Sequence, residues 1–332
     1  MTPRFLLLAL LLAACGGASL PLRTPVPPPD PAIAEAAREA LAAAENVSRG
    51  AVVVLDATNG QVLALVGRGP LGDQEGLRVA PTGSTWKALT VAAALEAGLD
   101  PARRFEDLEG RWGEGAAEVR DWEPRPWHDA RSTIVHSSNV GAALILHEVG
   151  PSPLLTLVDA LALREPIELP LGIAPATPVP SAVAWNLPVP DWGRLAPQAR
   201  PWAGGIGMEA TPLHLAVAYA AIANDGITYA PTPDGTGGRL RALRSETARA
   251  VQEMLVAAVL EGTGGPAGVE GVRVGGKTGT SRFEGGGGAL FAGFFPPRRV
   301  AVVRVEGSGE LYGGGSAGPV FRDLVQRLAA QP

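Results

Sequence analysis

The stretch Pro81-Thr82-Gly83-Ser84-Thr85-Trp86-Lys87 opens a segment that predicts a helix over 84–97, with a serine and a lysine on one face. A serine hydroxyl becomes a useful nucleophile when a base takes its proton. Lysine can be that base when burial or nearby positive charge lowers its pKa. An exposed helix with a capping serine is the simpler interpretation. The catalytic interpretation, with Ser84 as nucleophile and Lys87 as base, is favoured by the turn-forming Pro81-Thr82-Gly83 and by the apolar Trp86 and Leu89.

Ser137-Ser138-Asn139 is the second string with chemical content. Residues i and i+2 face the same way in an extended or turn segment, so Ser137 and Asn139 could both face Ser84 and Lys87. They would then relay a proton and hold a substrate amide. The alternative is a helix N-cap formed by Ser138 or Asn139.

Lys277-Thr278-Gly279-Thr280 is the third string, and it lies in a run with strand character. Gly279 would remove a side chain where a substrate backbone pairs with the strand. Lys277 and the hydroxyls of Thr278 and Thr280 suit a carboxylate, and Lys277 could also supply the charge that lowers the pKa of Lys87. The backbone N–H groups of Thr280 and Ser84 could form an oxyanion hole. An ordinary surface hairpin strand is the alternative.

The N-terminal residues predict a targeting signal. Arg4 precedes the apolar run 5–12, which is too short to span a bilayer, and Leu12-Ala13-Ala14-Cys15 follows. Cys15 is the only cysteine, so lipidation is a natural use of its thiol; an ordinary signal peptide with an incidental cysteine is the alternative. We therefore expect a signal peptide over 1–14, a lipidated, proline-rich tether over 15–30 and one domain over 31–332, held to a bacterial membrane outside the cytoplasm.

Composition and charge narrow the function further. The 332 residues are 46% hydrophobic and 18% charged, with a net charge of −5 and no basic block, which argues against nucleic-acid binding. The four histidines form no H-E-x-x-H pattern, so no metal site is predicted. We expect His136 to be a packing or hydrogen-bonding residue rather than a base.

The remaining pattern predicts strands at both ends of the chain with helices between them. The runs 51–55 and 62–66 flank Asn59-Gly60, a strong hairpin signal. Later strands are expected at 272–281, 289–295 and 300–305, while 111–130 is left unassigned and 166–202 is expected to be irregular. Helices are predicted over 32–45, 84–97, 139–147, 154–163, 211–224, 245–260 and 319–330. The fold class is therefore α/β (α+β), an antiparallel sheet with an adjoining helical lobe.

The three strings in this order resemble the serine acyl-transfer set of penicillin-recognising enzymes. From about Val47 onward the sequence resembles the penicillin-binding protein transpeptidase domain, particularly the class B type. Further matching segments are 51–67, 81–101, 136–143, the run GIGMEATPLHLAVAYAAIANDG over 205–226 and GGKTGTS over 275–281.

The resemblance implies Ser84 as the acylated nucleophile, Lys87 as its base, and Ser137 and Asn139 in proton relay and substrate binding. It implies that Lys277, Thr278 and Thr280 bind a terminal carboxylate, that of a D-Ala-D-Ala stem peptide of peptidoglycan or of a β-lactam. No metal or organic cofactor is implied. The acceptor stays open between a second peptide (transpeptidase) and water (carboxypeptidase), and a serine β-lactamase or a non-catalytic β-lactam-binding scaffold are the alternative functions.

Overall fold

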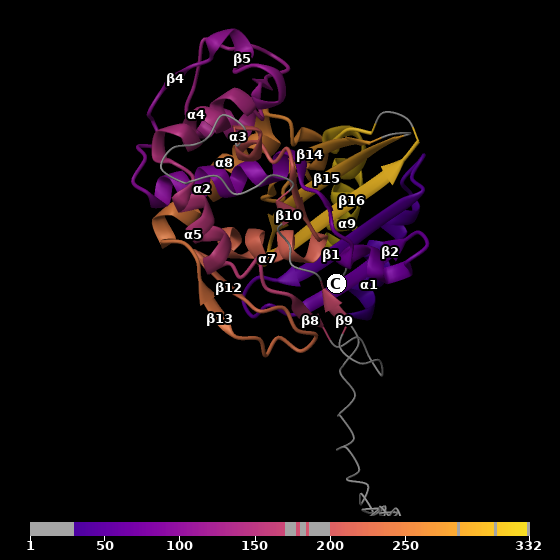
Figure 1. The fold of residues 1–332 in the computed structure, drawn as a ribbon. Coiled ribbons are helices and arrows are strands. Elements are labelled where there is room, and N and C mark those ends of the chain that lie inside the picture. Colours follow the sequence, from indigo (N-terminus) through magenta and orange to yellow (C-terminus); the bar gives the residue numbers. More distant parts are fainter. Residues whose placement is uncertain are drawn as a thin grey trace, which may run out of the picture.

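A five-stranded antiparallel sheet joins the two ends of the chain (Figure 1). The computed structural model describes residues 30–169, 177–179, 184–185, 200–283, 286–308 and 311–330. The strand order is β14-β15-β16-β1-β2, so the N-terminal hairpin pairs with the C-terminal strands through β1 and β16. The strands are β1 (Arg49–Asp56), β2 (Val62–Arg68), β14 (Gly275–Phe283), β15 (Gly286–Phe295) and β16 (Arg299–Gly307).

Both faces of this sheet are covered, which explains why β1 is apolar on both sides. Val52 and Val54 belong to the core formed with α1 (Pro31–Ala42) and α9 (Gly318–Ala329). Val53 and Leu55 belong to the core on the opposite face, with the central helices. Successive side chains of a strand point to opposite faces, so a run without alternation predicts this two-sided burial.

The helical lobe packs beside the sheet and is connected to it by α7 and α8 (Figure 1). All twelve residues of α7 are buried, between β1 and β16 on one side and the other helices on the other. Thr211 caps α7 by accepting a hydrogen bond from the His214 N–H. The helices are α2 (Lys87–Glu96), α3 (Ala130–Val135), α4 (Asn139–Val149), α5 (Ser152–Ala160), α6 (Arg200–Ala203), α7 (Pro212–Ala223) and α8 (Ser245–Glu261).

Short strands and turns complete the described part of the chain. β3 (Ala80–Pro81) pairs with β11 (Met208–Ala210), which fixes the turn in front of Ser84. The other short strands are β4 (Phe105–Glu106), β5 (Arg111–Trp112), β6 (Val119–Arg120), β7 (Trp127–His128), β8 (Ile167–Leu169), β9 (Thr177–Val179), β10 (Ala184–Trp185), β12 (Ile227–Tyr229) and β13 (Arg239–Arg241). The short helical turns are η1 (Gly72–Leu77), η2 (Gly83–Trp86), η3 (Leu108–Gly110), η4 (Gly115–Ala117), η6 (Gly265–Ala267) and the π-helix η7 (Gly313–Ala317).

The predicted fold class and the predicted hairpin are confirmed. Two local predictions were wrong. Ser84 lies in the 3-10 turn η2, and the α-helix begins only at Lys87. The strand predicted over 272–281 begins later, at Gly275. Among the described residues, a membrane crossing by one helix is not supported; only α4 and α5 taken together reach the needed length and apolarity, and they meet at 96°.

Candidate active site

The turn that carries Ser84 is pressed against the edge strand β14. Gly83 has a φ of +50°, and a Cβ built on it would lie 2.7 Å from the Thr280 carbonyl oxygen and 2.9 Å from the Thr280 nitrogen. Thr82 anchors the other side of the turn, donating to the Met208 carbonyl from its N–H at 2.9 Å and from its hydroxyl at 3.1 Å. Only glycine allows this backbone approach, which brings Ser84 next to Thr280.

Gly279 in β14 allows the same close contact between the strand and the nucleophile turn. A Cβ at Gly279 would lie 2.6 Å from the Thr82 carbonyl oxygen. The space that a side chain would fill is therefore occupied by the nucleophile turn. The pairing of a substrate backbone with the strand at Gly279 stays a prediction.

Lys87 is placed to act on Ser84. Its Nζ lies 2.8 Å from Ser84 Oγ, 2.6 Å from the Ser137 carbonyl oxygen and 3.2 Å from Ser137 Oγ. The side chain is fully buried, and this burial lowers the pKa of Lys87 to about 7, against an opposing effect of Asp121. A large share of the molecules at neutral pH therefore carries an uncharged amine that can accept the serine proton.

The Ser137-Ser138-Asn139 segment forms the helix cap that was the alternative interpretation, and it also brings Ser137 next to Lys87. Ser138 caps α4 by accepting from the Gly141 N–H at 2.7 Å, while Ser137 faces Lys87. Ser137 has a φ of +59°, an uncommon backbone conformation that aims its carbonyl at the lysine. Asn139 is oriented by its Nδ2, which donates to the Arg120 carbonyl at 2.6 Å.

Lys277 is fully buried and does not line the two cavities beside Ser84. Its Nζ lies 3.2 Å from both oxygens of Thr278 and 3.4 Å from Thr263 Oγ1. Burial first, and then the nearby Lys87, hold the pKa of Lys277 well below its ordinary value. Of the two causes considered for the lowered pKa of Lys87, burial is confirmed, and a contribution from Lys277 is not seen. A substrate carboxylate would favour the charged form of Lys277.

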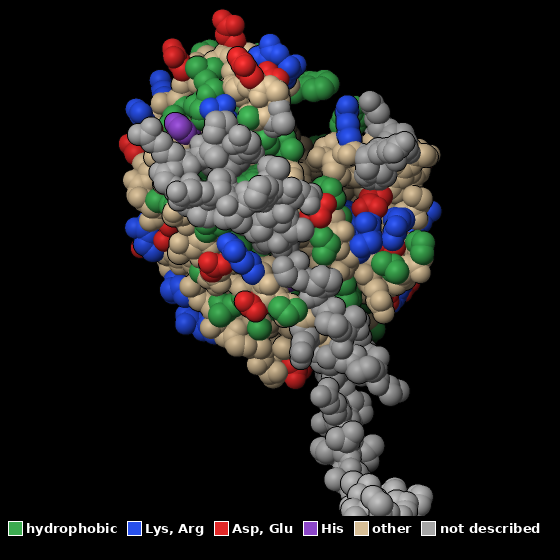
Figure 2. Space-filling model, in the orientation of Figure 1, with side chains coloured by type: hydrophobic (Ala, Val, Ile, Leu, Met, Phe, Trp, Pro, Cys, Tyr) green, Lys and Arg blue, Asp and Glu red, His purple; other side chains and the backbone are tan. Residues whose placement is uncertain are grey.

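Two cavities meet at Ser84, in the region where Figure 2 shows a notch in the surface between the helical lobe and the sheet. The sheet-side cavity, about 520 Å³, includes Thr278, Thr280 and Arg282, which alternate along one face of β14. The lobe-side cavity, about 580 Å³, is lined by Ser137 and Asn139 among others. Trp122, 91% exposed, borders both.

A larger cavity of about 670 Å³ lies between α1 and α9, away from these groups. Chemistry rather than volume therefore identifies the site.

Several residues of the site escaped sequence reasoning. Arg282 could have been found by the alternation that follows from Thr278 and Thr280. Thr263, after α8, accepts a hydrogen bond from Thr278 Oγ1 at 3.1 Å and lies 15 residues before it in the sequence, with no local pattern to connect the two. Asp107, Asp121 and His128 form a further group whose ligand atoms lie within 4.8 Å of one another, close enough to hold a metal ion. The histidine spacing gave no sign of this group.

These features define a class of protein, the serine acyltransferases in which a buried lysine activates the nucleophile. A family model described as the penicillin binding protein transpeptidase domain matches residues 50–326. The chain therefore belongs to the penicillin-binding protein transpeptidase family, and the family, fold class and class of enzyme predicted from the motifs are confirmed.

Two curated relatives are named probable peptidoglycan D,D-transpeptidase PenA. The chain is 30% identical to that of Neisseria flavescens over 308 residues, covering 83% of this chain and 74% of the relative. It is 30% identical to that of Neisseria gonorrhoeae over 310 residues, covering 83% of this chain and 51% of the relative.

Among solved structures, the chain resembles the TP domain of Burkholderia pseudomallei penicillin-binding protein 3. The TM-score is 0.77 at 27% identity, with 90% of this chain and 94% of that chain covered. A peptidoglycan glycosyltransferase from Burkholderia ambifaria gives a TM-score of 0.76 at 27% identity, covering 92% and 98%.

Proposed function

We propose that this chain is a D,D-transpeptidase of cell-wall synthesis that acts on peptidoglycan stem peptides ending in D-Ala-D-Ala. The observation that carries the proposal is the 2.8 Å contact between the buried Lys87 amine and Ser84 Oγ. Ser84 Oγ bonds to the carbonyl carbon of the penultimate D-Ala while Lys87 takes the serine proton. The C–N bond then breaks, the terminal D-Ala leaves with a proton returned from Lys87, and an acyl-enzyme remains.

The sheet side of the cleft supplies groups for the charges of this reaction. Close packing of Gly83 on Thr280 supports an oxyanion hole made of the Ser84 and Thr280 N–H groups. One such donor contributes about 10²–10³ in turnover. The hydroxyls of Thr278 and Thr280, with Arg282, line the sheet-side cavity and would bind the terminal carboxylate, and the buried Lys277 would add its positive charge through Thr278. Gly279 would contribute by holding the strand against the turn.

The lobe side would complete the transfer. Ser137, whose Oγ lies 3.2 Å from Lys87 Nζ, would pass the proton towards the leaving amine, and Asn139, which lines the lobe-side cavity, would hold the substrate amide. The acyl-enzyme is resolved by an amine of a second stem peptide, a choice favoured by the relatives' names. A β-lactam would occupy the same groups and acylate Ser84, because its strained amide replaces the scissile bond.

The test is a synthetic stem peptide ending in D-Ala-D-Ala, offered with and without an amine acceptor. The proposal predicts D-Ala release and a cross-linked product, both lost in Ser84→Ala and retained in Ser152→Ala, a matched change at an exposed serine. Hydrolysed peptide without cross-linked product would make the enzyme a carboxypeptidase. Rapid hydrolysis of an added β-lactam, with neither D-Ala release nor a cross-linked product from the peptide, would favour a β-lactamase. A Ser84 that takes no label from a penicillin, in a protein that still supports cell-wall synthesis, would favour a scaffold.

We further propose that residues 1–14 are a signal peptide, that Cys15 carries the lipid and that 15–30 is the tether of a transpeptidase domain over 31–332. Residues before Asp30 lie outside the described part, so the sequence alone supports the anchor. The domain would then work on the outer side of a bacterial membrane. Changing Cys15 to serine should move the protein from the membrane fraction to the soluble fraction, and unchanged fractionation would contradict the anchor.

A further inference from the structure

Asp121 holds the N-terminus of α4, the helix that begins with Asn139. Its Oδ1 accepts from the backbone N–H groups of Asn139 and of Val140, the latter at 3.0 Å. Its Oδ2 accepts from the Ser138 hydroxyl. The neighbouring Arg120 carbonyl binds the Asn139 side chain, so residues 120 and 121 together fix both backbone and side chain of the motif. A carboxylate is also favoured at a helix N-terminus by the backbone dipoles.

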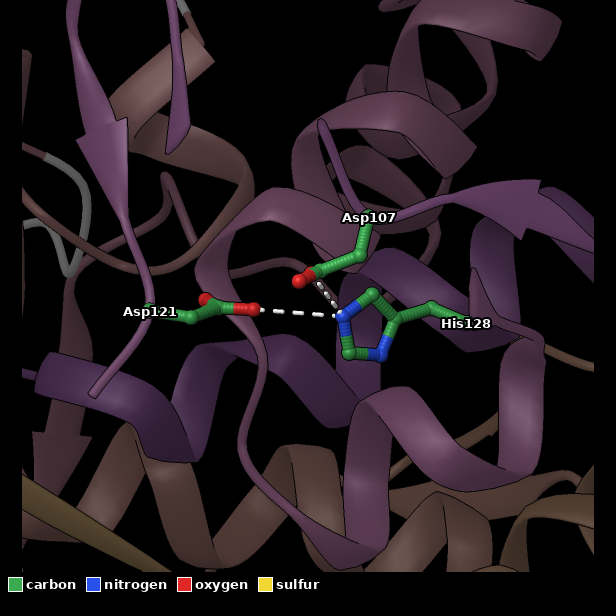
Figure 3. A group of neighbouring side chains, drawn as sticks. All are labelled: Asp107, Asp121 and His128. Carbon is green, nitrogen blue, oxygen red and sulfur yellow. Dashed lines mark hydrogen bonds and ion pairs between the residues drawn. The ribbon is translucent and has the colours of Figure 1, made fainter. Parts of the chain in front are cut away.

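Asp121 is in turn held by the buried imidazole of His128, and a second carboxylate, Asp107, contacts the same imidazole, as Figure 3 shows. His128 Nε2 lies 3.2 Å from Asp121 Oδ2 and also contacts Asp107 Oδ1. The three side chains are only 1–4% exposed. Asp107 is held from behind by the Arg125 N–H at 2.6 Å.

The charges within this group support one another. Burial alone would raise the pKa of Asp121, but hydrogen bonds from His128, Ser138 and the start of α4 outweigh it and lower the pKa. Burial alone would lower the pKa of His128, but Asp121 and Asp107 outweigh it and raise the pKa. The oxygens of Asp121 are thus engaged by four donors, which favours a hydrogen-bonded clamp over a metal site.

The clamp reaches the reacting groups in two ways. It restrains the chain directly after Ser137, whose positive φ must be maintained by its surroundings if its carbonyl is to stay 2.6 Å from Lys87 Nζ. In addition, the negative charge of Asp121 raises the pKa of Lys87 against the effect of burial. Position and charge of one carboxylate therefore act on the same base.

We propose that Asp121, supported by His128 and Asp107, is a positioning residue for the acylation of Ser84. It sets the geometry of Ser137 and Asn139 and the protonation of Lys87. This inference rests on the proposed function, because it concerns how that same site acylates.

Two substitutions separate position from charge. Asp121→Glu keeps the charge and displaces the oxygens by one methylene. Asp121→Asn keeps the size and removes the charge. Asp159→Asn is the matched control, since Asp159 is 63% exposed and pairs with Arg164 on the surface. The second-order rate of acylation by a fluorescent penicillin is measured between about pH 5.5 and 9, with thermal melting of each variant as the check on folding.

The proposal predicts that Asp121→Glu acylates about 10²-fold more slowly, with the acid limb of its pH profile where wild type has it. Asp121→Asn should also be slower, and its acid limb should move to lower pH because the carboxylate that favours charged Lys87 is gone. The charged groups that face Lys87 are Asp121, from the β6–β7 connection, and Lys277, from β14. Because both variants keep Lys277, a shift of the acid limb reports the change at Asp121.

If both folded Asp121 variants were acylated at the wild-type rate, with the acid limb of the pH profile unshifted, the proposal would be overturned. Absence of labelling in wild type itself would instead overturn the proposed function, so the two failures are distinguishable. If the Asp121 variants do not fold, Asp107→Asn serves in their place, because Asp107 supports Asp121 through His128 and is itself hydrogen-bonded by the Arg125 N–H. Slower acylation by folded Asp107→Asn supports the proposal, and an unchanged rate contradicts it.

Discussion

The protonation of Lys87 should appear directly as the pH dependence of acylation. The perturbation is pH alone, applied to a lysine whose pKa burial lowers from 10.5 to about 7. About half of the amines are then uncharged at pH 7, against roughly one in 3,000 for an ordinary lysine. Burial therefore increases the reactive form by about three orders of magnitude at neutral pH.

The assay is the second-order rate of labelling by a fluorescent penicillin under single-turnover conditions, with Ser84→Ala as the blank. We expect the rate to rise about tenfold per pH unit below pH 6, to reach half its maximum near pH 7 and to level off above pH 8. A rate that keeps rising up to pH 10 would show a lysine with its ordinary pKa. A rate independent of pH from 5.5 upward would show that Lys87 is not the base. Either result would refute the reasoning from burial.

Three further predictions concern the supports of the site. Lys87→Met should abolish labelling yet stabilise the fold at neutral pH. The pKa of Lys87 is about 7 in the folded state and about 10.5 in the unfolded state, so the free energy of unfolding rises with pH between these values, by up to about 1.4 kcal/mol per pH unit. The variant should lose this dependence on pH in urea titrations, and an equal dependence in both proteins would contradict the assignment. Gly83→Ala should slow acylation about 10²-fold, since its Cβ would lie 2.7 Å from the Thr280 carbonyl oxygen, and a wild-type rate would mean that the turn can shift freely. Glu75→Ala should cost about 3–5 kcal/mol of unfolding free energy because it removes a buried carboxylate that pairs with Arg49 and Arg78 and leaves the buried Arg304 with Glu306 alone; a loss below about 1 kcal/mol, measured by chemical denaturation, would contradict this.

Sequence reasoning succeeded where a local pattern determines the structure. The hairpin around Asn59-Gly60 follows from turn chemistry, and the contact between Lys87 and Ser84 follows from their helical spacing. The apolar run of β1 lacks alternation, which is enough to explain its burial on both faces. These features need only neighbouring residues for their explanation.

The rest depends on residues brought together from distant parts of the chain. Asp121 lies in a segment rich in Trp, Pro and Gly that has no periodicity, so neither the pairing of the preceding strand β6 nor the contact of Asp121 with Ser138 could be predicted. The role of Gly279 depends on the approach of Thr82, and the burial of Lys277 depends on α8 and the turn after it. Each of these is a consequence of packing between elements, which a single sequence does not display.

The most direct test of the account is the intact mass of the chain after incubation with a labelled penicillin, alongside Ser84→Ala, followed over hours. The account predicts one adduct per molecule that persists through the measurement in wild type and is absent from the variant. An adduct of equal yield on folded Ser84→Ala, or none on folded wild type, would contradict the claim that Ser84 is the acylated nucleophile.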